Sequence, residues 1–145
     1  MPTTRYGLPL LVPGQLQKDV THNEALTLID ALIDPVLEGW GIDLPPATAL
    51  PGQCWGVGPA PSGEWTGQPG ALAVGTAGGW RLIAVPDGFA ARSANDGGLV
   101  VKSATGWAVV PVVPTPSGGS VVDQECRAAL ATLLGALAAA GIASS

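Results

Sequence analysis

The chain has 145 residues, a formal net charge of −5 and only 12% charged residues. This length allows one modest domain, and the lack of a basic patch argues against nucleic-acid binding by phosphate neutralisation. Hydrophobic residues make up 47% of the chain, so its middle is not expected to be intrinsically disordered. So few charges beside so many apolar residues indicate a protein that buries surface against other subunits.

Residues 1–17 are predicted to form an extended arm, because they contain three prolines and two glycines that disfavour a helix or a central strand. Such an apolar arm is stable only against its own domain or a neighbouring subunit. The short apolar run 8–12 is interrupted by Pro9, and no secretory signal is expected.

Residues 18–40 are predicted to form an amphipathic helix. The run Thr21–Glu24 fits a capping box, and the glycines at 39 and 41 end the helical pattern. Apolar residues recur at helical spacing on one side and acidic residues on the other. The apolar stripe comprises Leu26, Ile29, Ile33 and Val36, widened by Leu28 and Leu32, and the acidic side comprises Asp30, Asp34 and Glu38.

Residues 41–113 are predicted to form the body, a small antiparallel β-meander. Residues 72–86 and 99–113 repeat one unit, which superposes Trp80 on Trp107. Each copy has an apolar strand, a small-residue turn and a second strand led by tryptophan, which is typical of a β-hairpin. A looser third copy runs from Cys54 to Thr66, with Trp65 in the leading position.

A linker at 114–120 precedes a predicted C-terminal helix, residues 121–141, with Ser120–Asp123 as its capping box. Its apolar residues follow a seven-residue alternation and it has almost no polar face, which indicates a helix bundled with copies of itself. Its most apolar stretch, about 16 residues, is shorter than the ~20 of a membrane span. The predicted oligomerisation residues are Leu130, Leu133, Leu134 and Leu137. The expected fold class is therefore α+β.

No catalytic, cofactor-binding or metal-binding residue is predicted. His22 has no second histidine at metal-ligand spacing, and no serine sits in a nucleophile elbow. Acids in the glycine-rich turns are interpreted as turn formers. Cys54 and Cys126 lack metal-type spacing and are interpreted as reduced, buried thiols.

The tryptophans allow two interpretations. In the first, they form the core or an intersubunit contact; in the second, they stack on sugars. The candidates for glycan stacking are Trp55, Trp65, Trp80 and Trp107.

Several runs closely resemble a domain of unassigned function found in structural proteins of alphaproteobacterial phages, prophages and gene transfer agents. They are Thr4–Pro9, Gly14–Leu26 (containing GQLQKDVTHNE), Leu28–Asp30, Pro45–Pro46, Pro51–Gly58 (PGQCWGVG), Gly63–Trp65 and Gly78–Trp80. The similarity spans about residues 3–88, and the closing helix is also similar to the ends of such proteins. In related particles the domain is associated with head-spike or tail-fibre components.

The resemblance implies a non-enzymatic virion protein, made in the bacterial cytoplasm, that acts as a base, an adaptor or a short spike or fibre and supports host attachment. Its expected partners are copies of itself, as a trimer or pentamer, and proteins of the capsid vertex or tail. The residues expected to dock on the particle are Tyr6, Leu8, Leu10, Gln15, Gln17 and Asn23. The alternative function is a carbohydrate-binding module that presents tryptophans to host polysaccharide.

Overall fold

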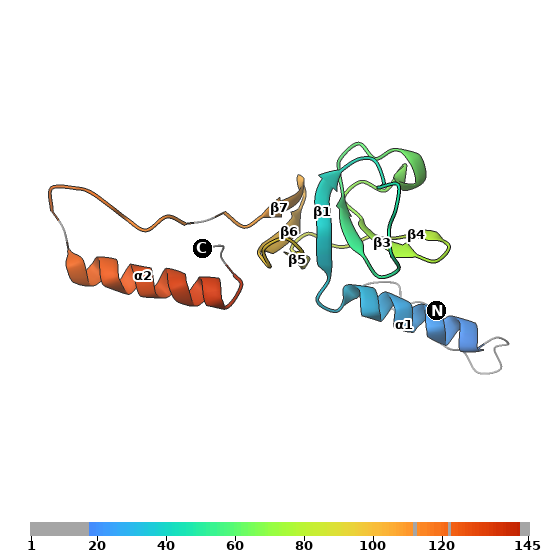
Figure 1. The fold of residues 1–145 in the computed structure, drawn as a ribbon, viewed down its shortest axis with the longest axis horizontal. Helices are drawn as coiled ribbons and strands as arrows, with labels where there is room; N and C mark the ends of the chain where they lie inside the picture. Colours follow the sequence, from blue (N-terminus) through green and yellow to red (C-terminus); the bar gives the residue numbers. More distant parts are fainter. Residues whose placement is uncertain (1–17, 112, 122, 143–145) are drawn as a thin grey trace.

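The computed structural model describes residues 18–111, 113–121 and 123–142 (Figure 1). The arm predicted for residues 1–17 lies outside these ranges. Two helices flank a sheet, and the elements in chain order are α1 (Lys18–Leu32), β1 (Val36–Ile42), β2 (Cys54–Val57), the 3-10 helix η1 (Gly63–Trp65), β3 (Leu72–Thr76), β4 (Gly79–Ile83), β5 (Ala90–Ser93), β6 (Leu99–Ser103), β7 (Gly106–Val109) and α2 (Gln124–Ala139). The predicted α+β fold class is confirmed.

The described strands form one seven-stranded sheet with the order β4-β3-β2-β1-β5-β6-β7. The central strand β1 runs parallel to both of its neighbours, β2 and β5. Every other pairing is antiparallel. The sheet is therefore two antiparallel meanders, β2–β4 and β5–β7, joined through β1, and not the single meander that the sequence predicts.

The internal repeat corresponds to the two hairpins β3–β4 and β6–β7. Gly75 pairs with Trp80 in the first hairpin, and Lys102 pairs with Trp107 at the equivalent place in the second. In each turn a hydroxyl donates to the carbonyl of the glycine that opens the next strand, from Thr76 at 3.0 Å and from Ser103 at 3.1 Å. The predicted Trp-led hairpins are confirmed in both copies.

The looser third copy does not form a hairpin. Its first part is β2, but Trp65 ends the 3-10 helix η1 and leads no strand. η1 sits in the connection between β2 and β3, and Trp65 is fully buried there. The prolines and glycines of this connection, at positions 58, 59, 61, 63, 67, 69 and 70, favour turns over a continuous strand.

The helix predicted for residues 18–40 ends at Leu32, and its expected last part is the strand β1. Asp34 has a left-handed backbone, with φ of 48°, a conformation that aspartate tolerates better than most residues. Pro35 disfavours a helical conformation of the residue before it. The chain therefore turns at these two residues and enters the sheet. Thr21, the expected N-cap, lies inside α1.

The predicted apolar stripe of α1 divides between the sheet and the solvent. Leu26, Ile29 and Ile33 are 50%, 38% and 68% exposed, whereas the helix packs on the sheet through the buried Ala31, flanked by Leu28 and Leu32. The sequence carries two overlapping apolar stripes, and the one with the small Ala31 at its centre contacts the sheet.

The sheet body has two clusters of buried side chains. One contains Leu37 of β1 with Leu72, Val100 and Trp107. The other contains Trp55, Val57 and Trp65, with Trp80 packed against it. The hairpin β6–β7 also contacts the connection between β2 and β3. The indole nitrogen Nε1 of Trp107 donates to the carbonyl of Gly70 at 3.1 Å.

Helix α2 follows an extended segment that leaves β7 (Figure 1), and Gly141, just after the helix, approaches the guanidinium of Arg92 on β5. Its N-cap is Asp123, whose carboxylate accepts from the Cys126 amide at 2.8 Å. The helix therefore begins three residues later than the box predicted at Ser120, because the Asp123 side chain caps Gln124–Ala139 by itself. Within α2, whose residues are all described, none is buried.

Candidate functional site

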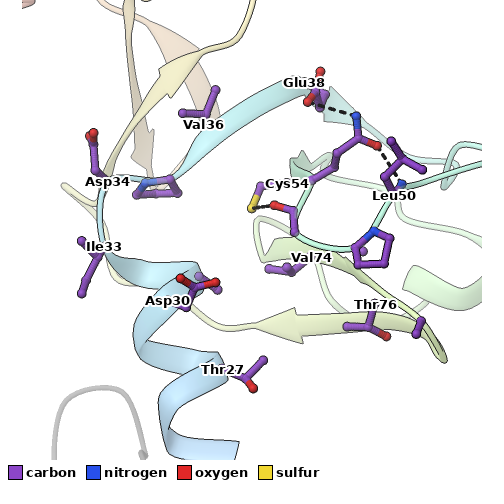
Figure 2. A pocket seen from close by; sticks show the side chains of 17 residues that line it. Thr27, Asp30, Ile33, Asp34, Val36, Glu38, Leu50, Cys54, Val74 and Thr76 are labelled. Atoms are coloured by element: carbon purple, nitrogen blue, oxygen red, sulfur yellow. Dashed lines mark hydrogen bonds between the residues drawn. The ribbon is translucent and has the colours of Figure 1, made fainter.

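A groove of about 640 Å³ opens between the C-terminal end of α1, the strand β1 and the loop that precedes β2 (Figure 2). We call it the α1–β1 groove. It takes in residues of α1 and the following turn, of β1, of the loop 50–53, and of β3 with its turn. Its volume falls within the roughly 300–1,000 Å³ typical of ligand pockets.

The helical wall of the groove follows from the spacing of its residues. Thr27, Asp30, Ala31 and Asp34 all line it, and separations of three and four residues place side chains on one face of a helix. Ala31 is buried beneath the groove, while Asp30 and Asp34 are exposed at its edge (Figure 2).

The opposite wall is held by the side chain of Gln53. Its amide nitrogen Nε2 donates to the carboxylate of Glu38 on β1 at 3.2 Å, and its oxygen Oε1 accepts from the backbone of Leu50 at 2.8 Å. The loop also hydrogen-bonds to β3 through the Gly52 amide and the Gly75 carbonyl at 2.9 Å. A Cβ at Gly75 would lie 2.7 Å from the carbonyl oxygen of Leu50, so only glycine allows this close approach.

The groove is acidic. Asp30, Asp34 and Glu38 line it, and among its described lining residues none is lysine or arginine. Outside the lining, the guanidinium Nε of Arg92 lies 3.6 Å from the Asp34 carboxylate, in an exposed ion pair. The groove therefore favours a cationic group at its rim and apolar groups on its floor.

Cys54 lies at the bottom of the groove and is 4% exposed. Its thiol donates to the Gly52 carbonyl at 3.5 Å. Burial, followed by the negative charges of Asp30 and Glu38, raises the pKa of Cys54 to about 11. Because the thiolate is the nucleophile, this thiol is poorly reactive at neutral pH. Both described cysteines are free. The expectation that both are buried is correct for Cys54 and wrong for Cys126, which is exposed.

The arrangement suits binding, and the raised pKa of Cys54 disfavours nucleophilic chemistry by that thiol. The groove contains no histidine beside the protonated thiol, whereas nucleophilic catalysis needs an adjacent base or a lowered pKa. Among the described residues, no group of three or more His, Cys, Asp or Glu side chains could hold a metal ion.

The tryptophans proposed for glycan stacking lie mainly inside the body. Trp55, Trp65 and Trp107 are 7%, 0% and 7% exposed. Trp80 is partly buried and contacts two of them edge-to-face, with ring centroids 5.1 Å from Trp55 and 5.0 Å from Trp65. A sugar needs an open ring face, and this packing leaves the buried rings none.

The residues predicted to dock on the particle lie at the N-terminal end of the chain. Tyr6, Leu8, Leu10, Gln15 and Gln17 lie outside the described residues, and Asn23 is exposed on α1.

On α2, Leu130 and Leu133 are 40% and 54% exposed, while Leu134 and Leu137 are partly exposed. The structure therefore brings none of these leucines into the body.

Sequence reasoning missed the groove. It placed Asp30, Asp34 and Glu38 on the solvated side of one helix, whereas Glu38 belongs to β1 and faces the groove from another wall. The signal that could have found it is Pro35, which separates the first two acids from the third.

These features define a small α+β protein with a mixed seven-stranded sheet, an acidic groove and two exposed helical faces. The chain belongs to the family described as Protein of unknown function (DUF2793), whose model matches residues 22–108. No curated protein matches the chain. Neither of the described helices is long and apolar enough to cross a membrane.

Proposed function

We propose that the chain is a non-enzymatic structural protein of a phage or gene-transfer-agent particle. It assembles as a homo-oligomer, a trimer or pentamer, and serves as a base, an adaptor or a short spike or fibre that supports host attachment. The proposal begins from the resemblance carried by Gly14–Leu26 and Pro51–Gly58. The family itself has no described activity.

The observation that supports assembly most is the exposure of α2, in which only Arg127, Leu134, Leu137 and Ala138 are partly covered. None of its described residues is buried, although leucine and alanine occupy most of its positions. A helix that is apolar around most of its circumference is stable when it is packed on several sides. Copies of α2 around a symmetry axis would supply that packing, with Leu130, Leu133, Leu134 and Leu137 in the seam.

A second apolar surface supports contact with another particle protein. The α1 face formed by Leu26, Ile29 and Ile33 is exposed, and the helix α1 lies at the opposite end of the molecule from α2 (Figure 1). Apolar surface exposed in this way marks interaction sites. One helix would therefore bind copies of the chain, and the other would bind the particle together with Asn23.

The body supports a scaffold role better than sugar binding. Its tryptophans pack on one another and on β2. Removing one of them would open the core, so the rings serve folding. Host attachment would then come from the position of the protein on the particle.

The test is the protein content of particles released by the bacterium that encodes the chain. Particles purified by density should contain peptides of this chain in a fixed ratio to the capsid protein. Deleting the gene should remove these peptides and reduce adsorption to host cells. Purified particles without the chain would contradict the proposal.

Two substitutions in α2 test whether incorporation into particles depends on this helix. Leu133→Glu should reduce incorporation into particles, whereas Gln124→Glu, an equal charge change on the same helix, should not. Both positions are exposed, so the body should stay folded in both variants. Equal incorporation of the two would contradict assembly through α2.

A further inference from the structure

We propose that the α1–β1 groove binds residues Arg5–Val12 of the same polypeptide as an extended segment. Arg5 would lie against the carboxylates of the groove, and the apolar residues that follow it would cover the floor. This inference goes beyond the proposed function and does not depend on it. It gives Tyr6, Leu8 and Leu10 a contact inside the chain and leaves particle docking to Leu26 and Ile29 of α1, because Ile33 also lines the groove.

Charge complementarity favours this occupant. Three acids line the groove, with no lysine or arginine among the described lining residues. Arg5 is the one charged side chain in residues 1–17. A guanidinium matches carboxylate geometry and retains its charge at any ordinary pH. Arg92 already pairs with Asp34, so Asp30 and Glu38 are the expected contacts of Arg5.

The composition of the segment fits the floor. Ile33, Val36 and Leu50 line the groove and are exposed. They therefore offer apolar surface above the buried Ala31 and Val74. The segment supplies Leu8, Leu10 and other apolar side chains in sequence. Its Pro9 suits an extended conformation, because proline has a fixed φ and no amide hydrogen.

The distances also permit it. From Lys18 to Asp30 the helix advances about 18 Å, at 1.5 Å per residue. From Val12 to Lys18 an extended chain can span about 20 Å, at roughly 3.3 Å per residue. A reversal of direction before Lys18 uses part of this length, and each residue before Val12 adds about 3.3 Å, so the chain is long enough for Arg5–Leu10 to reach the groove.

Cys54 provides a direct test, because it lies at the bottom of this groove. In a full-length Cys126→Ser background, Leu8→Cys, Leu10→Cys and Val12→Cys would be introduced one at a time and oxidised mildly. A disulfide requires Cα atoms within about 7 Å. At least one of the three should form an intramolecular bond to Cys54, and Thr3→Cys serves as the control outside the segment.

The crosslinking experiment has two kinds of outcome. A disulfide within one polypeptide, detected by mass after digestion, supports the assignment. Failure of all three cysteines to form it, or a disulfide that joins two chains, overturns it. Neither result affects the particle test, so failure here is distinguishable from failure of the proposed function.

A charge exchange tests the polar contact separately, using the alkylation rate of Cys54 in the Cys126→Ser chain. Arg5→Glu should release the segment and accelerate alkylation by about tenfold, as expected when local opening becomes easier. Adding Asp30→Lys should restore most of the protection, whereas Glu64→Lys, a reversal outside the groove, should not. An alkylation rate that is insensitive to Arg5→Glu would overturn the contact.

Discussion

Gly56 on β2 shows how one residue permits the two halves of the sheet to pack. A Cβ at this position would lie 2.8 Å from the indole ring of Trp107 on β7. That ring is buried and cannot move aside without disturbing the first core cluster. The close approach of β7 to β2 therefore depends on the missing side chain.

Gly56→Ala should lower the free energy of unfolding by about 1–3 kcal/mol, the usual effect of overpacking a core. The matched control is Gly78→Ala in the β3–β4 turn, where a Cβ would meet nothing within 4 Å. The control should stay within about 0.5 kcal/mol of the original chain. Urea denaturation measures both variants, and equal effects would contradict the packing described.

Two buried tryptophans differ in hydrogen bonding. Trp107 donates to the Gly70 carbonyl at 3.1 Å, whereas the buried indole nitrogen of Trp65 has no hydrogen-bond partner among the described residues. Both Trp→Phe changes remove the same volume. The difference between their losses of stability therefore reports mainly the hydrogen bond that Trp107 makes and Trp65 lacks. Trp107→Phe should be more destabilising than Trp65→Phe by about 1–3 kcal/mol. The reverse order in urea denaturation would contradict the structure.

The Cys54 thiol should make stability depend on pH. Its pKa is raised from 9.0 to about 11 in the folded chain, first by burial and then by Asp30 and Glu38. Between these values the folded chain keeps a proton that the unfolded chain has lost. The folded state thus binds more protons there, and stability falls as pH rises.

We expect a loss of about 1–3 kcal/mol in the free energy of unfolding between about pH 9 and 11. Urea denaturation at stepped pH measures it. Other groups titrate in the same window, so the informative quantity is the difference from Cys54→Ala, which should lack this component. Parallel pH profiles for the two chains would refute the assignment.

At the scale of elements, the sequence predicted the parts whose signals are local. The Trp80 and Trp107 hairpins were predictable because each contains a complete strand, turn and strand pattern. The C-terminal helix was predictable from its composition. The strand β1 was not, because Val36 and Leu37 continue the apolar spacing of α1 and only Pro35 marks the boundary.

The groove could not be predicted for a related reason. Its walls come from α1, β1 and β3, and the pairing of β1 with both β2 and β5 sets their arrangement. Parallel pairings between distant segments leave no periodic signal in the chain. The contact between Gln53 and Glu38 depends on that register.

Helix α2 should be energetically independent of the body. Asp123→Ala should lower its helicity, since loss of an N-cap costs about 0.5–2 kcal/mol. The five tryptophans of the chain all lie between residues 40 and 107, so their fluorescence reports the body alone. We expect less helical circular dichroism and an unchanged fluorescence melting curve. A shift of the fluorescence midpoint would show that α2 supports the body.

At the scale of the whole molecule, the sheet acts as a spacer between two surfaces. Helix α1, with its exposed apolar side chains, lies at one end and α2 at the other (Figure 1). Their separation allows each to bind a different partner without competing for the same site. Closed assemblies of one chain repeat a single contact around an axis, and α2 is the element that offers such a contact.

Assembly of the chain should depend on α2. The most direct measurement is the native mass of the purified protein, 14.4 kDa per chain, with and without residues 121–145. We expect the full chain to be a discrete trimer or pentamer and the truncated chain to be a folded monomer. A folded monomer in both cases would contradict it.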